Sequence, residues 1–587
     1  MRKLIFTVII IICSIGTSAQ YYIRGEVNDE HGEPLSNAKI YMPSTRSIFY
    51  SGYVGGFGIP TSKLYDSLII SKSGYITQAI KINSTLYQKV VLKMIAVNTS
   101  VETQKLISLT SGKDGNMLPL SYFNGESYTN IIENDFIKTD LQTKTSFSMR
   151  TDKASYSNVR RIINQGMKVP TDAVRIDEML NYFNFNYREP PRGDVFKLTS
   201  QLTSCPWNKE HQLLFIDLSA RKLNLEKIPP SNLVFLIDVS GSMDQPNRLP
   251  LLKAAFHLLV KNLRPIDTVS IVVYGGTVGI WLKPTCGSEK EKISKSIEEL
   301  NASGDTPGEA AIRTAYKLAE TTYIKGGNNR IILATDGDFN VGQASEKELE
   351  NLISKEKLSG VFLTCLGVGM GNYKDSKIEV LAKKGNGNFA YIDDLREAEK
   401  ILITEFTQTM YSVASDVFLS VRFNPNLVAQ YRLLGYDNKK SVLDVKSTVL
   451  EGGEIGSGAD NTIVFELVPA VKELNDSLAG ISINYRTLAD STFQSIYYNC
   501  SNNYVPLQQL AKSWQFATAV TMFGLKLRGS VYFPPVDWDV IKKLAQDACS
   551  PNNYLQSEFI SLLDKCKVIY YEKKKKRKHK TNTHSNS

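Results

Sequence analysis

Residues 233–242 read LVFLIDVSGS, a short apolar run that ends in an aspartate followed by small and polar residues. Further strand-like runs follow at 268–274, 330–334, 361–366 and 388–392. Between them, segments with the apolar spacing of helices lie at 288–300, 307–322, 345–357 and 375–384. Strands that are apolar throughout and alternate with helices are typical of a doubly wound sheet covered on both faces. We therefore expect an α/β domain over 229–412.

Oxygen-bearing side chains occupy three loops of this predicted domain. The first loop carries Asp238, Ser240 and Ser242, the second carries Thr306, and the third carries Asp336. Because such sheets bind ligands at the carboxyl ends of their strands, we expect the three loops to meet at one edge. Two carboxylates and three hydroxyls are hard donors, which suit Mg²⁺, Mn²⁺ or Ca²⁺ better than softer metals. The sequence therefore predicts a divalent metal site.

The D-x-S-x-S pattern, the threonine and the second aspartate resemble the metal-ion-dependent adhesion site of von Willebrand factor type A and integrin inserted domains. The resemblance implies that Ser240, Ser242 and Thr306 contact the metal or hold its waters. It implies that Asp238 and Asp336 act largely through water and hydrogen bonds. It also implies an open coordination position, which a Glu or Asp of a protein partner can fill.

Other residues of the three loops carry further expectations. Gly241 and Gly337 are expected to let the backbone turn closely around the ion. Asp305 departs from the family pattern, in which a small residue is common, and its charge is expected to favour Ca²⁺ or to weaken binding of an acidic ligand. Asp244 is expected to be exposed to solvent.

Segments that read as helices and strands flank the α/β domain. Before it, helical spacing is found at 155–164 and 171–183, and strand-like runs at 195–202 and 212–218. After it, strand-like runs lie at 417–423, 463–468 and 482–485, and helical spacing near 507–528, 538–548 and 556–568. We expect the α/β domain to be inserted into a β-rich frame built from 195–220 and 415–498.

Several flanking motifs resemble the bacterial YfbK-like group of von Willebrand factor type A proteins. They are YSNVRR (156–161), DAVRIDEMLNYF (172–183), YRLLGYDN (431–438), GEIGSG (453–458) and the segment 517–527. The resemblance covers about 130–570 and sharpens the expected architecture. The resulting domains are a von Willebrand-associated N-terminal region (128–228), the type A domain (229–412), a β-rich C-terminal region (413–500) and a helical C-terminal region (501–570).

Residues 20–95 read as a small β-sandwich, with strand-like segments at 22–27, 38–41, 67–71 and 88–93. The pattern G-x-V-x-D-x-x-G-x-P-L-x-x-A over 25–38 resembles the carboxypeptidase regulatory-like domain, which is common at the N-termini of exported Bacteroidetes proteins. The resemblance implies an accessory domain without peptidase activity. The glycine-rich run 52–58 lacks the setting and ending of a phosphate-binding loop, so we expect a turn there. A polar linker is expected over 96–127.

The first residues have the features of an export signal. Arg2 and Lys3 precede the apolar run 4–15, and the small residues that follow predict cleavage after Ala19, which makes 1–19 a signal peptide. Two alternatives stay open. An uncleaved run would anchor the protein, although it is shorter than the roughly 20 residues that span a bilayer, and Cys13 would be acylated in a lipoprotein. We expect an exported protein of the periplasm or cell envelope.

The net charge of +10 is concentrated at the two ends of the chain. The tail (571–587) has seven positive charges, all within 573–580, and the leader has two; without these nine the net charge is +1. We expect a solvated, disordered tail. Attraction of that tail to an anionic lipid surface, a glycan or nucleic acid is the alternative. A nearly neutral body without a basic, aromatic-bearing fold argues against nucleic-acid binding as the function.

The sequence gives little support for catalysis. It has no nucleophile elbow, HExxH motif or phosphate-binding loop, and its six cysteines beyond Cys13 form no C-x-x-C pair. We therefore expect a non-enzymatic, exported protein that engages an acidic group of a protein partner through a divalent cation. The alternative is a metal-independent scaffold that assembles in the envelope.

Overall fold

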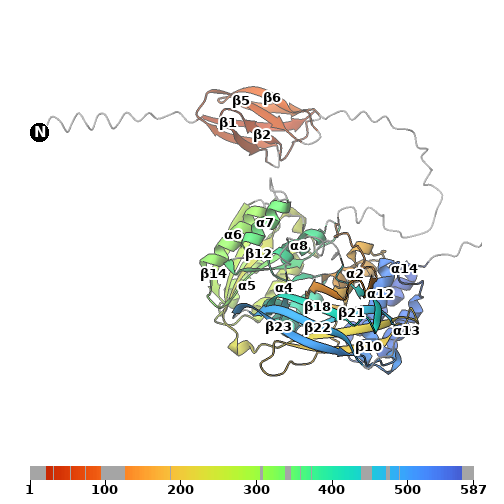
Figure 1. Ribbon diagram of the computed structural model, residues 1–587. Helices are drawn as coiled ribbons and strands as arrows, with labels where there is room; N and C mark the ends of the chain where they lie inside the picture. The colour runs from red at the N-terminus through yellow and green to blue at the C-terminus, as the bar shows by residue number, and fades with distance from the viewer. Residues whose placement is uncertain are drawn as a thin grey trace, which may run out of the picture. The chain divides into compact units, whose positions relative to one another are not determined.

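The computed structural model describes residues 21–93 and 126–571, with internal gaps at 31, 53–54, 73–74, 186, 276, 305–307, 338–345, 357–358, 372, 438–451, 471–475 and 488–489. The predicted signal peptide, almost all of the predicted linker and the predicted tail except Tyr571 lie outside the described residues. The chain divides into two compact units, Met1–Asn116 and Met117–Ser587 (Figure 1). Within the described ranges, no helix has both the length and the apolar character needed to cross a bilayer.

The smaller unit consists of two sheets whose inner faces contribute to one buried apolar core. One sheet has the order β4-β1-β7 and the other the order β3-β2-β5-β6. The strands are β1 (Tyr21–Asp29), β2 (Lys39–Met42), β3 (Ser47–Tyr50), β4 (Gly56–Thr61), β5 (Tyr65–Ser71), β6 (Gln78–Asn83) and β7 (Tyr87–Leu92).

The prediction of a turn over 52–58 is wrong in its second half, because β4 begins at Gly56. A side chain at Gly58 would begin 2.5 Å from the hydroxyl of Tyr22 on the neighbouring strand β1. The ring of Tyr22 therefore occupies the space beside position 58 that a side chain would otherwise fill.

The larger unit contains the predicted α/β domain, whose sheet has the order β14-β13-β12-β15-β16-β17. All neighbouring strands are parallel except β13 and β14. The strands are β12 (Ser231–Asp238), β13 (Thr268–Gly275), β14 (Thr277–Cys286), β15 (Asn328–Thr335), β16 (Phe362–Gly367) and β17 (Phe389–Tyr391). The helices are α4 (Leu249–Lys261), α5 (Lys290–Glu298), α6 (Gly308–Thr321), α7 (Glu346–Glu356), α8 (Asp375–Lys384), α9 (Leu395–Glu399) and α10 (Phe406–Met410). The prediction of a doubly wound sheet is confirmed.

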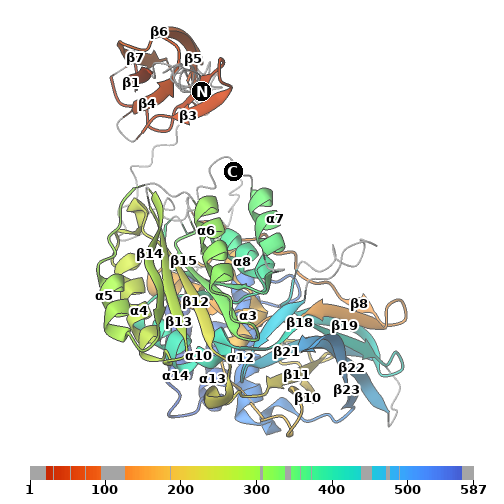
Figure 2. The same cartoon turned by 90° about the vertical axis from the view of Figure 1, so that its left-hand side faces the viewer.

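Strand β12 is apolar from Leu233 to Ile237, and every one of its residues is buried. Alternate residues point to opposite faces of the sheet. Phe235 and Ile237 lie in the core that includes residues of α4 and α5, and Val234 and Leu236 lie in the core that includes residues of α6, α7 and α8. Figure 2 shows the two groups of helices on opposite faces of this sheet.

The flanking segments form two further sheets around the α/β domain. The first has the order β10-β11-β21-β19-β8, and the second has the order β20-β18-β22-β23, with β9 paired to β18. The strands are β8 (Ile137–Lys138), β9 (Lys144–Ser148), β10 (Phe196–Ser204), β11 (Gln212–Ala220), β18 (Ser412–Phe423), β19 (Val428–Leu434), β20 (Gly453–Gly456), β21 (Asp460–Pro469), β22 (Ser477–Thr487) and β23 (Asp490–Ser501). Strand β11 precedes the α/β domain in the sequence and β21 follows it, and the two strands pair. Strands from both flanks therefore share one sheet, as the predicted frame requires.

The remaining helices gather at one side of the larger unit (Figure 1) and share one apolar core with residues of β11 and β21. They are α2 (Ala154–Asn164), α3 (Ile176–Asn181), α12 (Lys512–Arg528), α13 (Trp538–Ala548) and α14 (Tyr554–Ile569). The helix predicted over 171–183 is broken into a single 3₁₀ turn at Thr171–Ala173 and the short helix α3. The break lies at Arg175, whose backbone is extended and donates its N–H to the side chain of Ser155.

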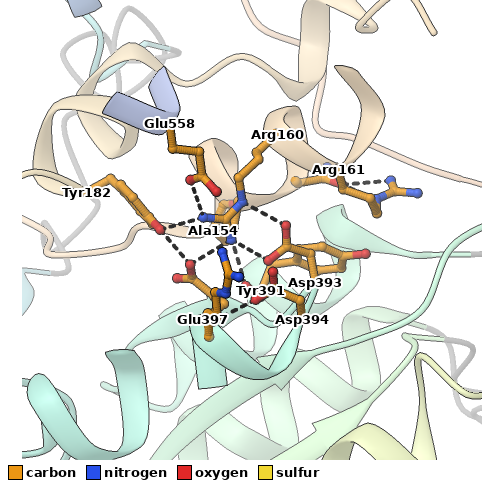
Figure 3. Close-up of polar contacts among 12 residues, drawn as sticks. Ala154, Arg160, Arg161, Tyr182, Tyr391, Asp393, Asp394, Glu397 and Glu558 are labelled. Carbon is orange, nitrogen blue, oxygen red and sulfur yellow. Dashed lines mark hydrogen bonds and ion pairs between the residues drawn. The ribbon is translucent and has the colours of Figure 1, made fainter. Parts of the chain in front are cut away.

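A buried cluster around Arg160, called here the Arg160 junction, joins three distant parts of the chain (Figure 3). Arg160 on α2 donates to Asp393 after β17, to Glu397 on α9 at 2.8 Å and to Glu558 on α14 at 3.0 Å. It also donates to the hydroxyl of Tyr182 at 2.8 Å. Burial raises the pKa of Asp393 to about 6 although the Arg160 guanidinium opposes the shift. One cation thus holds three carboxylates from the α/β domain and the C-terminal helices.

A second buried ion pair ties the α/β sheet to the frame. Arg330 on β15 lies 2.8 Å from Glu454 on β20, and each side chain is only 1% exposed. A buried charge that loses its partner is strongly destabilising. The α/β domain therefore depends on the frame for charge compensation, and experiments on the site are best made on the whole chain.

Candidate metal centre

The two predicted carboxylates lie side by side because their strands do. Asp238 is the last residue of β12, and Asp336 directly follows β15. These strands are parallel neighbours, in register from Ser231 and Asn328 to Ile237 and Ala334, so their carboxyl ends meet at one edge of the sheet. Both aspartates are fully buried.

Four of the five predicted residues form one continuous chain of close polar contacts. Oδ1 of Asp238 accepts from the backbone N–H of Ser240 at 3.0 Å and from its hydroxyl at 2.6 Å. The hydroxyls of Ser240 and Ser242 are 3.2 Å apart. Ser242 then donates to Oδ2 of Asp336 at 2.9 Å. The structure therefore gathers oxygen atoms from the first and third loops at a single place.

Thr306 and Asp305 lie outside the described residues, but the start of their loop is described. The N–H of Ser303 donates to the carbonyl of Val239 at 2.6 Å, and the carbonyl of Gly304 accepts from the N–H of Gly241 at 3.0 Å. The second loop therefore begins against the loop that carries Ser240 and Ser242.

Of the two glycines expected to allow a close backbone turn, Gly337 has a backbone that requires glycine and Gly241 does not. Gly337 has a φ of +83°, and a side chain there would begin 2.9 Å from Cβ of Lys374, so glycine is required. Gly241 does not have a positive φ, and an added Cβ would meet only an ordinary contact at 3.7 Å. The sequence pattern does not point to Gly275, yet a side chain there would clash with the carbonyls of Val239 and Ser303 at 2.5 and 2.7 Å. Gly275 lets the first two loops approach each other.

Two further residues contact the predicted carboxylates. The hydroxyl of Thr335 donates to Oδ2 of Asp238 at 2.9 Å and accepts from the N–H of Gly337 at 3.0 Å. Nη1 of Arg248 lies 2.9 Å from Oδ2 of Asp336. A hydroxyl at the end of an apolar strand, next to an aspartate, was a usable signal for Thr335. Nothing in the spacing of the sequence points to Arg248.

The surroundings of Asp238 favour a nearby positive charge. Burial raises the pKa of Asp238 to about 6, hydrogen bonds from Ser240 oppose the shift, and the neighbouring Asp336 adds to it. A buried carboxylate in this position is stabilised by a nearby positive charge. The donors are carboxylate and hydroxyl oxygens, which are the ligands that hard divalent cations prefer. Asp244, the other carboxylate of the first loop, is exposed, as expected.

Comparison with known protein families gives three matches along the larger unit. Residues 122–215 match the family described as von Willebrand factor. Residues 233–338 match the von Willebrand factor type A domain. Residues 408–569 match the C-terminal region of the uncharacterized protein YfbK.

Individual relatives and solved structures extend this comparison. The uncharacterized protein YfbK of Escherichia coli K12 is 38% identical over 444 residues, which is 71% of this chain and 77% of that protein. The inter-alpha-trypsin inhibitor heavy chain H2 of Mesocricetus auratus is 28% identical over 173 residues, which is 28% of this chain and 18% of that protein. The solved structure of a von Willebrand factor type A protein from Catenulispora acidiphila is 14% identical, with a TM-score of 0.37, and the match covers 66% of this chain and 98% of that one.

Proposed function

The chain belongs to the YfbK family of von Willebrand factor type A proteins, and on this premise we propose that it binds an acidic group of a protein partner through a divalent cation. The cation is Mg²⁺, Mn²⁺ or Ca²⁺, and it is held by Asp238, Ser240, Ser242, Thr306 and Asp336. The function is binding rather than catalysis.

One observation carries this proposal: the oxygen atoms of Asp238, Ser240, Ser242 and Asp336 follow one another in close contact at the carboxyl edge of the sheet. Two fully buried carboxylates at neighbouring strand ends are costly to bring together unless positive charge compensates them. Asp238 positions Ser240 through two hydrogen bonds, and Asp336 positions Ser242 through one. When bound, the cation would offer an open coordination position to a carboxylate of the partner.

The remainder of the chain fits a role in the cell envelope. The N-terminal leader is the basis for proposing export, and the two-sheet unit over 21–93 is proposed to be an accessory carboxypeptidase regulatory-like β-sandwich of the kind common in exported Bacteroidetes proteins. We propose the basic tail, because of its positive charge, as the segment that would contact an anionic membrane surface.

Capture of partners in the presence and absence of metal tests the proposed function. The mature chain (residues 20–587) is immobilised and exposed to an envelope extract in Mg²⁺, then washed with EDTA. We expect specific proteins to be retained in Mg²⁺ and released by EDTA, because the partner carboxylate is held through the metal. The variant with Ser240→Ala and Ser242→Ala is expected to retain none of them.

A matched control is the variant with Ser557→Ala and Ser561→Ala, which removes two exposed serines bonded to carbonyls of their own helix α14. This control is expected to behave like the unmodified chain. Partners that stay bound in EDTA and also bind the variant lacking Ser240 and Ser242 hydroxyls would contradict the proposal and support the metal-independent scaffold.

A further inference from the structure

Arg248, the residue immediately before α4, places its guanidinium at the candidate metal centre. Nη1 lies 2.9 Å from Oδ2 of Asp336 and also donates to the backbone carbonyl of Ser242. Nη2 donates to the carbonyl of Met370 at 2.9 Å. The side chain is only 10% exposed and that of Asp336 is fully buried, so water screens this charge-assisted contact little.

Arg248 and Ser242 contact the same oxygen atom of Asp336. Oδ2 of Asp336 accepts the hydroxyl of Ser242 and is paired with the guanidinium at the same time. A divalent cation held by Ser242 and Asp336 would be next to a fixed positive charge, and like charges repel strongly where screening is weak. Binding of the metal and formation of the Arg248–Asp336 pair therefore oppose each other.

The loop that accepts Arg248 is shaped for this contact and is held by the segment before the α/β domain. Gly369 has a φ of +85°, and a side chain there would begin 2.6 Å from Nε of Arg248, so glycine makes room for the guanidinium. Oε1 of Glu126 accepts from the N–H of Gly371 at 2.8 Å, one residue beyond the carbonyl of Met370 that binds Arg248. The loop that binds Arg248 is thus itself held by the N-terminal region.

We propose that Arg248 is an internal counter-cation that neutralises Asp336 in the metal-free protein and lowers the affinity of the centre for a divalent metal. The proposal rests on the proposed function, because it concerns the same centre. It makes metal binding conditional on separating the guanidinium from Asp336. It also makes the metal affinity dependent on the loop Gly369–Gly371 and its contact with Glu126.

Titration calorimetry with Mg²⁺ on the chelator-stripped mature chain tests this proposal. Arg248→Gln removes the charge and keeps a polar side chain, and we expect it to bind Mg²⁺ at least about tenfold more tightly than the unmodified chain. Arg313→Gln is the matched control, since Arg313 is an exposed cation on α6 paired with Glu309. The Mg²⁺ affinity of this variant is expected to stay within about twofold of that of the unmodified chain.

A second measurement follows unfolding in EDTA. Without Arg248 the buried Asp336 has lost a counter-charge, so Arg248→Gln is expected to lower the midpoint of the unfolding transition in EDTA. Saturating Mg²⁺ is expected to raise this midpoint more in the variant than in the unmodified chain. Arg248→Lys, which keeps the charge but loses the fork that reaches both Asp336 and Met370, is expected to have an intermediate Mg²⁺ affinity. It provides the affinity comparison if the glutamine variant does not fold.

The outcomes separate this inference from the proposed function. Mg²⁺ binding that is lost in Asp238→Ala but is equal or weaker in Arg248→Gln (or in Arg248→Lys, if that variant is used) overturns the inference and leaves the proposed function standing. Absence of Mg²⁺ binding in the unmodified chain and in both Arg248 variants overturns both.

Discussion

Replacing Arg160 by methionine is expected to destabilise the larger unit by about 3–5 kcal/mol at pH 8. The substitution keeps much of the apolar stem but leaves Asp393, Glu397 and Glu558 without their shared cation. The side chains of Asp393 and Glu397 are only 7% and 2% exposed, so water cannot replace the guanidinium. Urea unfolding followed by tryptophan fluorescence measures the effect, because all four tryptophans of the chain lie in the larger unit.

The stability deficit of the Arg160→Met variant, meaning its loss of unfolding free energy relative to the unmodified chain, is expected to depend on pH in a definite direction. The folded-state pKa of Asp393 is already raised to about 6, against about 3.9 in an unfolded chain. Loss of Arg160 removes a group that lowers it, so the pKa rises further. A raised folded-state pKa favours the folded state at low pH and is a penalty as pH rises through it. The deficit should therefore be smaller at pH 5 than at pH 8.

The matched control for this prediction is Arg313→Met, which removes a cation that is 56% exposed on the helix surface. Exposed pairs contribute about 0–1 kcal/mol, so this variant should unfold close to the unmodified chain. A deficit for Arg160→Met no larger than that of the control, or one that is equal at pH 5 and pH 8, would show that the Arg160 junction does not compensate buried charge.

Replacing Asp238 by alanine is expected to weaken Mg²⁺ binding by about 100-fold or more. Asp238 fixes both the backbone and the hydroxyl of Ser240, and loss of a group that orients metal ligands costs about 10–100-fold in affinity. The lost carboxylate also removes one of the two negative charges beside the cation. Calorimetric titration with Mg²⁺ measures the change.

Asp244→Ala provides the comparison for Asp238→Ala, because Asp244 is a carboxylate of the same loop but is exposed to solvent. Screening makes an exposed charge a weak contributor, so its removal should change the Mg²⁺ affinity by less than about threefold. Equal losses in the two variants would mean that the loop attracts cations only by its overall charge.

Much of the α/β domain could be predicted because burial on both faces leaves a plain signal. Every residue of β12 is buried, and its sequence is correspondingly apolar from Leu233 to Ile237, directly before Asp238. Strands β14 and β23 gave no such signal, since both lie at sheet edges and β14 exposes half of Ile280 and nearly half of Trp281. Edge strands mix polar and apolar residues because one side of them faces solvent.

The juxtaposition of Asp238 and Asp336 could also be predicted, because it follows from parallel strand order alone. Arg248 and the Arg160 junction could not. The guanidinium of Arg248 reaches Asp336 because Gly369 leaves space for it and the carbonyl of Met370 accepts one of its hydrogen bonds. Arg160 meets Glu558 across 398 positions of the chain. Contacts of long charged side chains depend on the tertiary arrangement, and the spacing of neighbouring residues in the sequence does not predict them.

Anomalous diffraction from crystals of the chain soaked in Mn²⁺ tests the metal centre most directly. The account predicts a Mn²⁺ peak within coordination distance, about 2.0–2.3 Å, of the hydroxyl oxygens of Ser240 and Ser242, with Arg248 withdrawn from Asp336. A map at saturating Mn²⁺ with no peak between these residues, and with Arg248 still paired to Asp336, would contradict it.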